Sequence, residues 1–149
     1  MFTVSVVVGV DAELDESSVE DVNQTEDRIV SQWTGREVSV KERHKLRDRF
    51  NQILRPLGLQ TKLVVVERAN SLALYFICMT LAALMSLRDQ WRSRQLRHTV
   101  QKLFTFLSRA TDTVRATDTV RVKRLLWPLS DYRRCLNFFK SVEGKLTVQ

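Results

Sequence analysis

The order in which the hydrophobic pattern changes along the chain constrains the fold more than any other feature. Near the N-terminus apolar residues alternate, from about residue 40 they recur every three or four positions, and at 62–66 and 72–78 they run together in short stretches. A helical spacing then returns, followed by one more strand-like run and one more helical stretch. Period two is typical of strands and period 3.6 of helices. The chain therefore reads as strand, helix, strand, strand, helix, strand and a final helix.

The first strand is expected over residues 3–10, where β-branched side chains suited to a pleated surface alternate. Residues 11–35, which follow, are polar, acidic and almost without periodicity. Such a composition disfavours a packed element, so we expect an acidic loop insertion over about residues 11–37. A weak helix near residues 22–33 is the alternative.

Both ends of the next helix are marked in the sequence. Ser39 and Glu42 form a capping box, in which the Ser hydroxyl accepts from a backbone amide and the Glu carboxylate reaches back to the cap. Pro56 and Gly58 disfavour continuation, so the helix should end near Arg55. Its inward face is an apolar stripe made of Leu46, Phe50, Ile53, Leu54 and Leu57.

Two apolar runs, residues 62–66 and 72–78, flank a short polar connection and predict a hairpin. The second run continues without a clear break into residues 81–87. A membrane span is the competing interpretation, but residues 72–87 are fewer than the ~20 needed to cross a bilayer. We therefore expect a buried strand followed by a helix, with an apolar helical stripe continuing over residues 96–107.

The C-terminal third contains an exact tandem repeat, ATDTVR at residues 110–115 and again at 116–121. Two copies of six residues are too few for a solenoid, so the repeat is expected to lengthen the connection to a strand over residues 119–127. Pro128 ends that strand. Ser130 and Asp131 mark the start of a short helix through residue 139, with Gly144 as its exit.

Together these elements predict an α+β fold, a ferredoxin-like sandwich with a four-stranded antiparallel sheet and helices on one face. The order βαββαβ plus a C-terminal helix fills residues 1–149 as a single domain, which is an ordinary domain size. In such a layered arrangement the second face of the sheet stays free.

No catalytic, metal-binding or cofactor-binding pattern accompanies these elements, so we expect a non-enzymatic protein. The two histidines, His44 and His98, lie near cationic residues, and both are expected to be solvated. Cys78 and Cys135 each lie in an apolar stretch, which indicates buried, reduced thiols. The N-terminus lacks the basic start of a secretory signal, so a cytoplasmic location is expected.

The net charge of +7 conceals a division along the chain. Residues 1–35 carry eight acidic residues and one basic residue, whereas residues 36–149 carry 23 Lys or Arg and nine acidic residues. A basic body with an acidic N-terminal segment could bind acidic partners or could fold that segment over its own basic surface. A solvated surface without a partner is the third possibility.

Strand alternation sends one set of side chains toward the helices and the other set to the free face. The inward set is expected to be Val4, Val6, Val8, Leu72, Leu74, Phe76, Val120, Val122 and Leu126. The outward set is expected to be Thr3, Ser5, Val7, Ala73, Tyr75, Ile77, Arg121, Lys123 and Leu125. This outward set is a small-to-apolar platform bordered by two cations, and exposed apolar patches of this kind mark partner sites. Tyr75 is expected to anchor a partner, and Arg121 and Lys123 to steer an acidic one.

A basic nucleic-acid-binding domain that uses the arginine-rich helix 88–109 is the alternative function. RNA-recognition sheets stack bases on aromatic residues of their two central strands. Here those strands lack the Lys/Arg-Gly-aromatic signature, so positive charge alone supports phosphate contact. Nucleic acid is therefore the less favoured partner.

Roughly residues 60–140 contain three informative strings, VVVERANSLALYFICM, LRDQWRSRQLRHTVQKLF and VRVKRLLWPLSDYRRCLNFF. These strings resemble the TRADD-like N-terminal domain group. TVSVVVGVD and KERHKLRDRFNQIL match more loosely. The resemblance implies a four-stranded antiparallel sheet with helices on one side.

The same resemblance implies an adaptor domain for protein–protein interaction in intracellular signal transduction, of the death-receptor, apoptosis or innate-immune type, with a TRAF-type adaptor as partner. The family's contacts lie on the open sheet face and the hairpin tip, at positions that match Thr3, Ser5, Glu67 and Ala73. The aromatic anchors of the family's first strand are replaced here by Thr3 and Ser5. This departure puts the TRAF partner in doubt and leaves the surface as the candidate.

Overall fold

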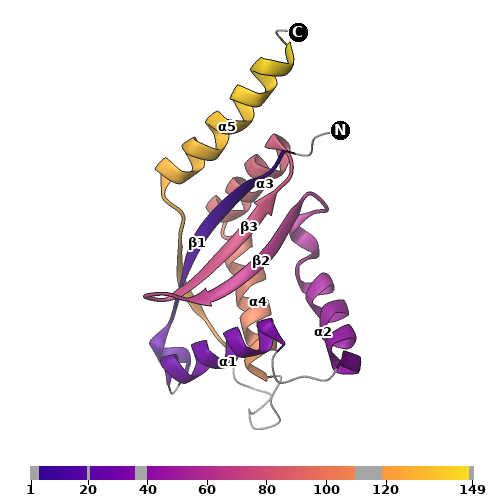
Figure 1. The fold of residues 1–149 in the computed structure, drawn as a ribbon. Helices are drawn as coiled ribbons and strands as arrows, with labels where there is room; N and C mark the ends of the chain where they lie inside the picture. Colours follow the sequence, from indigo (N-terminus) through magenta and orange to yellow (C-terminus); the bar gives the residue numbers. More distant parts are fainter. Residues whose placement is uncertain (1–3, 20, 36–39, 110–118, 148–149) are drawn as a thin grey trace.

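The computed structural model describes residues 4–19, 21–35, 40–109 and 119–147, with the backbone alone for 40–43 and 144–147 (Figure 1). The elements are, in chain order, β1 (Val6–Leu14), the 3-10 turn η1 (Glu16–Ser18), α1 (Val22–Thr34), α2 (Val40–Ile53), the 3-10 turn η2 (Arg55–Leu57), β2 (Thr61–Arg68), β3 (Leu72–Cys78), α3 (Leu81–Arg92), α4 (Gln95–Arg109), β4 (Val122–Leu126) and α5 (Leu129–Thr147). The strands form one antiparallel sheet in the order β2-β3-β1-β4. The predicted α+β class with a four-stranded antiparallel sheet is confirmed. Each connection from β1 to β2 and from β3 to β4 contains two helices where the sequence predicted one.

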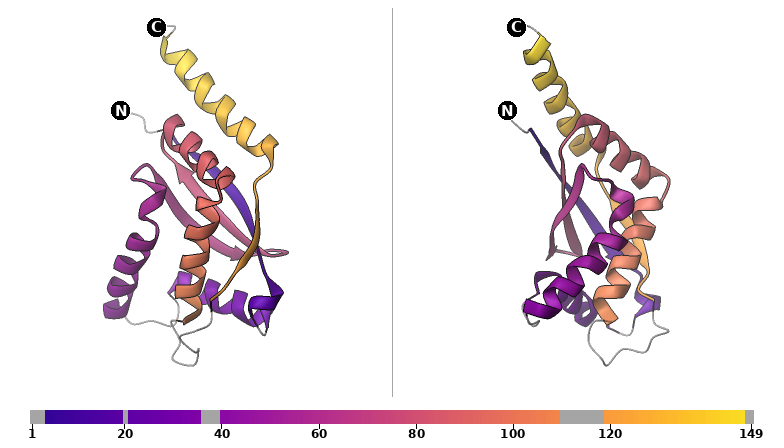
Figure 2. Two further views of the ribbon diagram at one scale, coloured as in Figure 1. Left: turned by 180° about the vertical axis from the view of Figure 1, so that it is seen from behind. Right: turned by 90° about the vertical axis from the view of Figure 1, so that its right-hand side faces the viewer.

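The helices lie unevenly around the sheet. The edge-on view on the right of Figure 2 places α3 and α4 to one side of the sheet with α2 on the same side, and α1 passes beneath the lower end of the sheet. α5 lies beyond the upper part of β1. The core fills the space between sheet and helices, and its largest fully buried side chains include Phe76, Leu72 and Leu74 of β3, Leu84 of α3, Leu103 and Phe104 of α4, and Ile29 of α1. One face of the sheet therefore has no described helix across it.

The first strand begins and ends later than predicted, at Val6–Leu14 instead of residues 3–10. Its buried positions alternate as far as Ala12 and Leu14, whose side chains are 1% and 4% exposed. The interleaved acidic residues, Asp11 and Glu13, point to the other face, where water can solvate them. Their charge gave this part of the strand the composition of a loop.

The acidic loop expected over residues 11–37 is wrong for most of its length, because the end of β1, η1 and α1 occupy it. The alternative helix near residues 22–33 is confirmed by α1. Asp21 caps this helix by accepting from the Gln24 amide, and Gly35 ends it in a left-handed conformation at φ 67°. The inward face of α1 contains the polar residues Glu26 and Gln32 beside Ile29, which weakened the apolar periodicity.

The other helices follow the sequence with changes at their ends. α2 ends at Ile53 instead of Arg55. Ser39 of the expected capping box lies outside the described residues. So does the ATDTVR repeat, except for its last residues from Thr119 onward. The expected continuous helix over 88–109 is broken at Ser93 and Arg94 (φ 68°), which separates α3 from α4. α5 continues past residue 139 to Thr147, because Gly144 does not end it. None of the helices in the described part of the chain is long and apolar enough to cross a bilayer.

The predicted hairpin is confirmed, with β2 extended to Thr61–Arg68 and paired with β3. β4 is shorter than the predicted strand, and its pairing with β1 shifts between Glu13 and Leu14. The shift reverses the alternation that we expected at the end of the strand. Leu125 is buried and Leu126 is 44% exposed, the opposite of the prediction.

Candidate functional site

The uncovered sheet face, hereafter the open face, is ordered into rows by the strand register. One row joins Val65 of β2, Tyr75 of β3 and Gly9 of β1, and the adjacent row joins Glu67, Ala73 and Asp11. A third row, toward the other end of the strands, joins Lys62, Ile77 and Val7. Figure 1 looks onto this face, with β1, β3 and β2 in front of α3 and α4.

Tyr75 lies at the centre of the open face, and its ring rests on the glycine of the next strand. A Cβ placed on Gly9 would be 3.5 Å from Tyr75 Cε1, which is an ordinary van der Waals distance, so the ring lies directly beside this position of β1. The Glu67 carboxylate, through a side-chain hydrogen bond and then its charge, raises the pKa of Tyr75. Asp11 adds a smaller effect in the same direction. The phenol is therefore held near two carboxylates.

Apolar side chains are exposed around this ring. Val7, Val65 and Leu126 have exposed fractions of 50%, 40% and 44%, against 0–1% for Val8 and Val10, which point from β1 into the core. Ile77 is half-buried beside Val7. The open face of the sheet thus exposes apolar side chains to water, and another molecule can bury them.

The two cations expected to border the platform have other surroundings. Lys123 lies 3.6 Å from Glu13, and its neighbour Arg124 bonds the other oxygen of the same carboxylate. These contacts, with the Arg124 hydrogen bond first, lower the pKa of Glu13. Arg121 precedes β4, where its backbone joins Ser18 and Asp15 of the η1 turn. The expected cationic rim is thus compensated at Lys123, while Asp11 and Glu67 stand beside the central row.

The structure brings together five of the predicted site residues: Val7, Glu67, Ala73, Tyr75 and Ile77. Ala73 is only 5% exposed, because it lies between the side chains of its row. Ser5 is exposed just before β1, and Thr3 lies outside the described residues. Sequence reasoning missed Gly9, Asp11, Val65 and Leu126. Continued alternation past residue 10 would have indicated Asp11, whereas the register shifts in β2 and β4 that expose Val65 and Leu126 leave no signal in the sequence.

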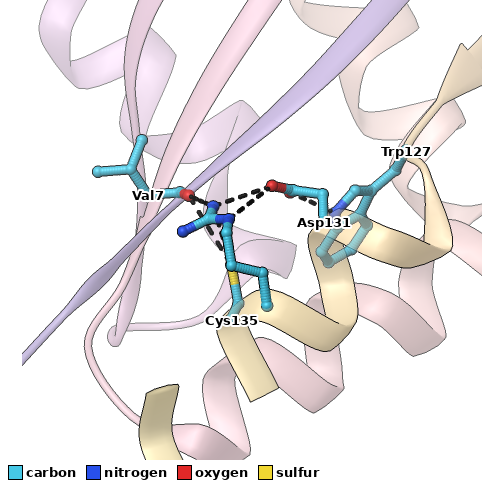
Figure 3. Close-up of polar contacts among 5 residues, drawn as sticks. Val7, Trp127, Asp131 and Cys135 are labelled. Carbon is cyan, nitrogen blue, oxygen red and sulfur yellow. Dashed lines mark hydrogen bonds and ion pairs between the residues drawn. The ribbon is translucent and has the colours of Figure 1, made fainter. Parts of the chain in front are cut away.

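The C-terminal helix covers the edge of β1 beside Val7, since β4 pairs only with Asp11–Leu14. Arg134 of α5 donates from Nη2 to the Val7 carbonyl at 3.1 Å, and Asp131 holds the same guanidinium at 2.9 Å (Figure 3). Asp131 also accepts from Trp127 Nε1 at 3.0 Å. This chain of contacts satisfies a backbone carbonyl at an otherwise unpaired edge, where unpaired strands invite unwanted pairing. It leaves the Val7 side chain exposed on the open face.

One groove, of about 1060 Å³, lies between the end of α1, α2, η2 and β2. Trp33, Phe50, Leu54 and Leu63 are among its lining residues. The described residues of its lining include no histidine or cysteine and one carboxylate, Asp48, so they assemble no acid–base pair and no nucleophile with a base. No cluster of three or more His, Cys, Asp or Glu suited to a metal ion occurs within the described ranges.

Comparison of the chain with family models, with curated proteins and with solved structures found no match.

Proposed function

We propose that this chain is a non-enzymatic protein-interaction domain that binds a folded partner through the open face. The observation that carries the proposal is the asymmetry of the sheet: apolar side chains are exposed around Tyr75 on the face that no described helix covers. An amphipathic aromatic ring at the centre of an apolar patch is a typical anchor in protein interfaces.

The charges of the open face indicate the chemistry of the partner. Glu67 and Asp11 flank Ala73 in one row, about 10 Å apart because two strand spacings separate them. A partner that presents an apolar patch with an Arg or Lys opposite this row would be attracted by both carboxylates and could pair with either one. This departs from the expectation of an acidic partner, because Lys123 and Arg124 share the Glu13 carboxylate, and Lys62 lies in a separate row toward the other end of the strands.

The size of the face indicates a transient contact. Three strand spacings by the nine residues of β1 give a face of about 14 by 30 Å. Faces of this size fall at the small end of specific interfaces, where signalling encounters are common. The role favoured by the family resemblance, an adaptor in death-receptor, apoptotic or innate-immune signalling, requires contacts of this kind.

A photo-crosslinking amino acid at Val65 tests the use of the open face. Val65 is 40% exposed on the open face, and Met85, 48% exposed on α3, is a matched control on the helical side. With a purified TRAF domain as the first probe, we expect a crosslinked product from position 65 and none from position 85. Equal crosslinking from both positions, or crosslinking from position 85 alone, would contradict the proposal.

If the TRAF domain gives no product at either position, the same two variants are used in cell extract and the product is identified by mass spectrometry. The identified protein is then purified and titrated against wild type and Glu67→Lys. We expect at least a tenfold loss of affinity in Glu67→Lys, because a repulsive charge would face the partner's cation. Unchanged affinity would refute the basic partner.

A further inference from the structure

The helical side of the molecule carries a second surface, of different chemistry from the open face. The described segments 44–59 and 92–109 contain nine Lys or Arg residues and a single acidic residue, Asp48. The acidic residues near the N-terminus lie mainly on β1, η1 and α1. The fold therefore places an excess of positive charge on α2, η2 and α4.

Part of this charge surrounds a groove between α2 and α4, hereafter the α2–α4 groove. It has a volume of about 480 Å³ and is lined by Arg49, Ile53, Gln101, Lys102, Thr105, Phe106, Arg109 and Thr119. Arg49 contributes from α2, with its guanidinium carbon 5.5 Å from the centroid of the Phe106 ring. Lys102 contributes from α4, so cations stand on both walls.

The polar residues in the groove have structural tasks that fix its shape. Gln101 accepts the Val122 amide at 3.0 Å, and the Thr105 hydroxyl accepts the Val120 amide at 3.1 Å. These bonds hold the segment before β4 against α4. By contrast, Arg49 and Lys102 form no ion pair with a carboxylate within the described part of the chain, so their charges are available to a ligand.

The composition of this surface selects among anionic ligands. None of the large hydrophobic residues that the structure describes as exposed belongs to α2 or α4. Leu59, which is 94% exposed, follows η2 and lines the other groove, beside β2. A folded protein partner would require an apolar interface centre, and an interfacial membrane site would require apolar side chains to insert. Nucleic-acid interfaces are instead polar and rich in positive charge, and an aromatic ring in a basic groove is typical of single-strand binding.

We propose that the α2–α4 groove binds the phosphate backbone of single-stranded nucleic acid without sequence specificity. Arg49 and Lys102 contact phosphates from opposite walls, and the Phe106 ring, packed against Phe50, supports the Arg49 guanidinium in the groove. The arginine-rich stretch 88–109 considered from the sequence supplies only part of this site, because Arg88 is buried and α2 provides the second wall. The proposal is independent of the open face.

The test is the fluorescence anisotropy of a labelled 15-nucleotide oligouridine titrated with the full chain over a series of salt concentrations. We expect a log–log salt slope of about −1.4, since the two phosphate contacts contribute about 0.7 each. Arg49→Glu/Lys102→Glu should lose at least tenfold in affinity. The matched control is Arg133→Glu/Lys140→Glu on α5, where both side chains are exposed and the change in charge is the same. This control should stay within twofold of wild type.

Equal losses in the two variants would overturn the proposal, because binding would then follow net charge alone. So would equal competition by polyglutamate at the same charge concentration, or tighter binding to phosphatidylserine vesicles than to the oligonucleotide. If urea unfolding shows that the Glu variant is not folded, Arg49→Gln/Lys102→Gln replaces it. The neutral pair should lose at least fivefold, and unchanged affinity in that pair would also overturn the proposal.

Discussion

Arg88 of α3 donates a hydrogen bond from Nη1 to the backbone carbonyl of Trp127 at 3.0 Å, which joins the helical layer to the segment between β4 and α5. Its guanidinium carbon lies 4.3 Å from the ring centroid of Trp91, 5.0 Å from that of Trp127 and 4.9 Å from that of Tyr132. The residue is 7% exposed and has no carboxylate partner among the described residues. Ring faces and one carbonyl therefore hold this charge in place of a counter-ion. Burial, and then repulsion by Arg92, lowers the pKa of Arg88.

Substitutions at Arg88 should separate packing from charge. Arg88→Ala leaves a cavity among three aromatic rings, so we expect a loss of about 2–4 kcal/mol in the free energy of unfolding. Arg88→Met fills the same space without a buried charge, and we expect a change within about 1 kcal/mol. Urea unfolding of both variants checks this. An equal loss in both would show that the bond to Trp127 outweighs the packing.

Glu26 of α1 should destabilise the protein at neutral pH. Burial, which outweighs the attraction of Arg68 at 3.7 Å, raises the pKa of Glu26 above its ordinary 4.5. The folded state therefore binds a proton at Glu26 more tightly than the unfolded state does, and stability falls as pH rises through the folded pKa. We expect Glu26→Gln to have a higher urea midpoint than wild type at pH 7, with the difference vanishing by pH 4.

Asp27 provides the control for that experiment. Its carboxylate is exposed and bonds Arg68, which also donates to the backbone carbonyl of Asn23 at 3.0 Å. We expect Asp27→Asn to lower the urea midpoint at pH 7 slightly, because it removes an attraction without relieving burial. A lower midpoint in Glu26→Gln as well would mean that the Glu26 charge is stabilising, contrary to the expected sign.

The two cysteines should be unreactive in the native state. Burial raises the pKa of the Cys78 thiol to about 11, and burial also raises that of Cys135. Because the thiolate is the reactive form, at pH 8 we expect no fast reaction of either thiol with Ellman's reagent in the native protein and two equivalents after unfolding in guanidinium. Reaction of one equivalent within seconds in the native protein would contradict the buried positions.

The elements with strong periodicity were predictable, because the signal lies within each element's own sequence. The hairpin of β2 and β3 and the apolar stripe of α4 bury uniform apolar faces, so period and burial coincide. α1 escaped confident prediction because Glu26 and Gln32 share its buried face with Ile29. The break between α3 and α4 depends on the left-handed backbone of Arg94, and an arginine in the sequence does not indicate that conformation.

The candidate site was predictable where strands pair regularly. Tyr75 and Ile77 face outward as alternation predicts. β3 is paired with β1 and β2, and the irregularity in its pairing with β2 lies in β2, so the side chains of β3 keep alternating. Leu125 and Leu126 exchanged faces because the pairing of β4 with β1 shifts register. The charge of the rim could not be predicted either, because the contacts of Lys123 and Arg124 with Glu13 join positions about 110 residues apart.

The central claim, that the open face binds a partner through Tyr75, is tested most directly by calorimetric titration of the identified partner into Tyr75→Asp and Phe76→Asp. These neighbours on β3 point to opposite sides of the sheet, and Phe76 is 0% exposed. We expect Tyr75→Asp to keep a melting temperature near that of wild type while binding is lost, and Phe76→Asp to be unfolded. Unchanged affinity in a folded Tyr75→Asp variant, or unfolding of both variants, would contradict the claim.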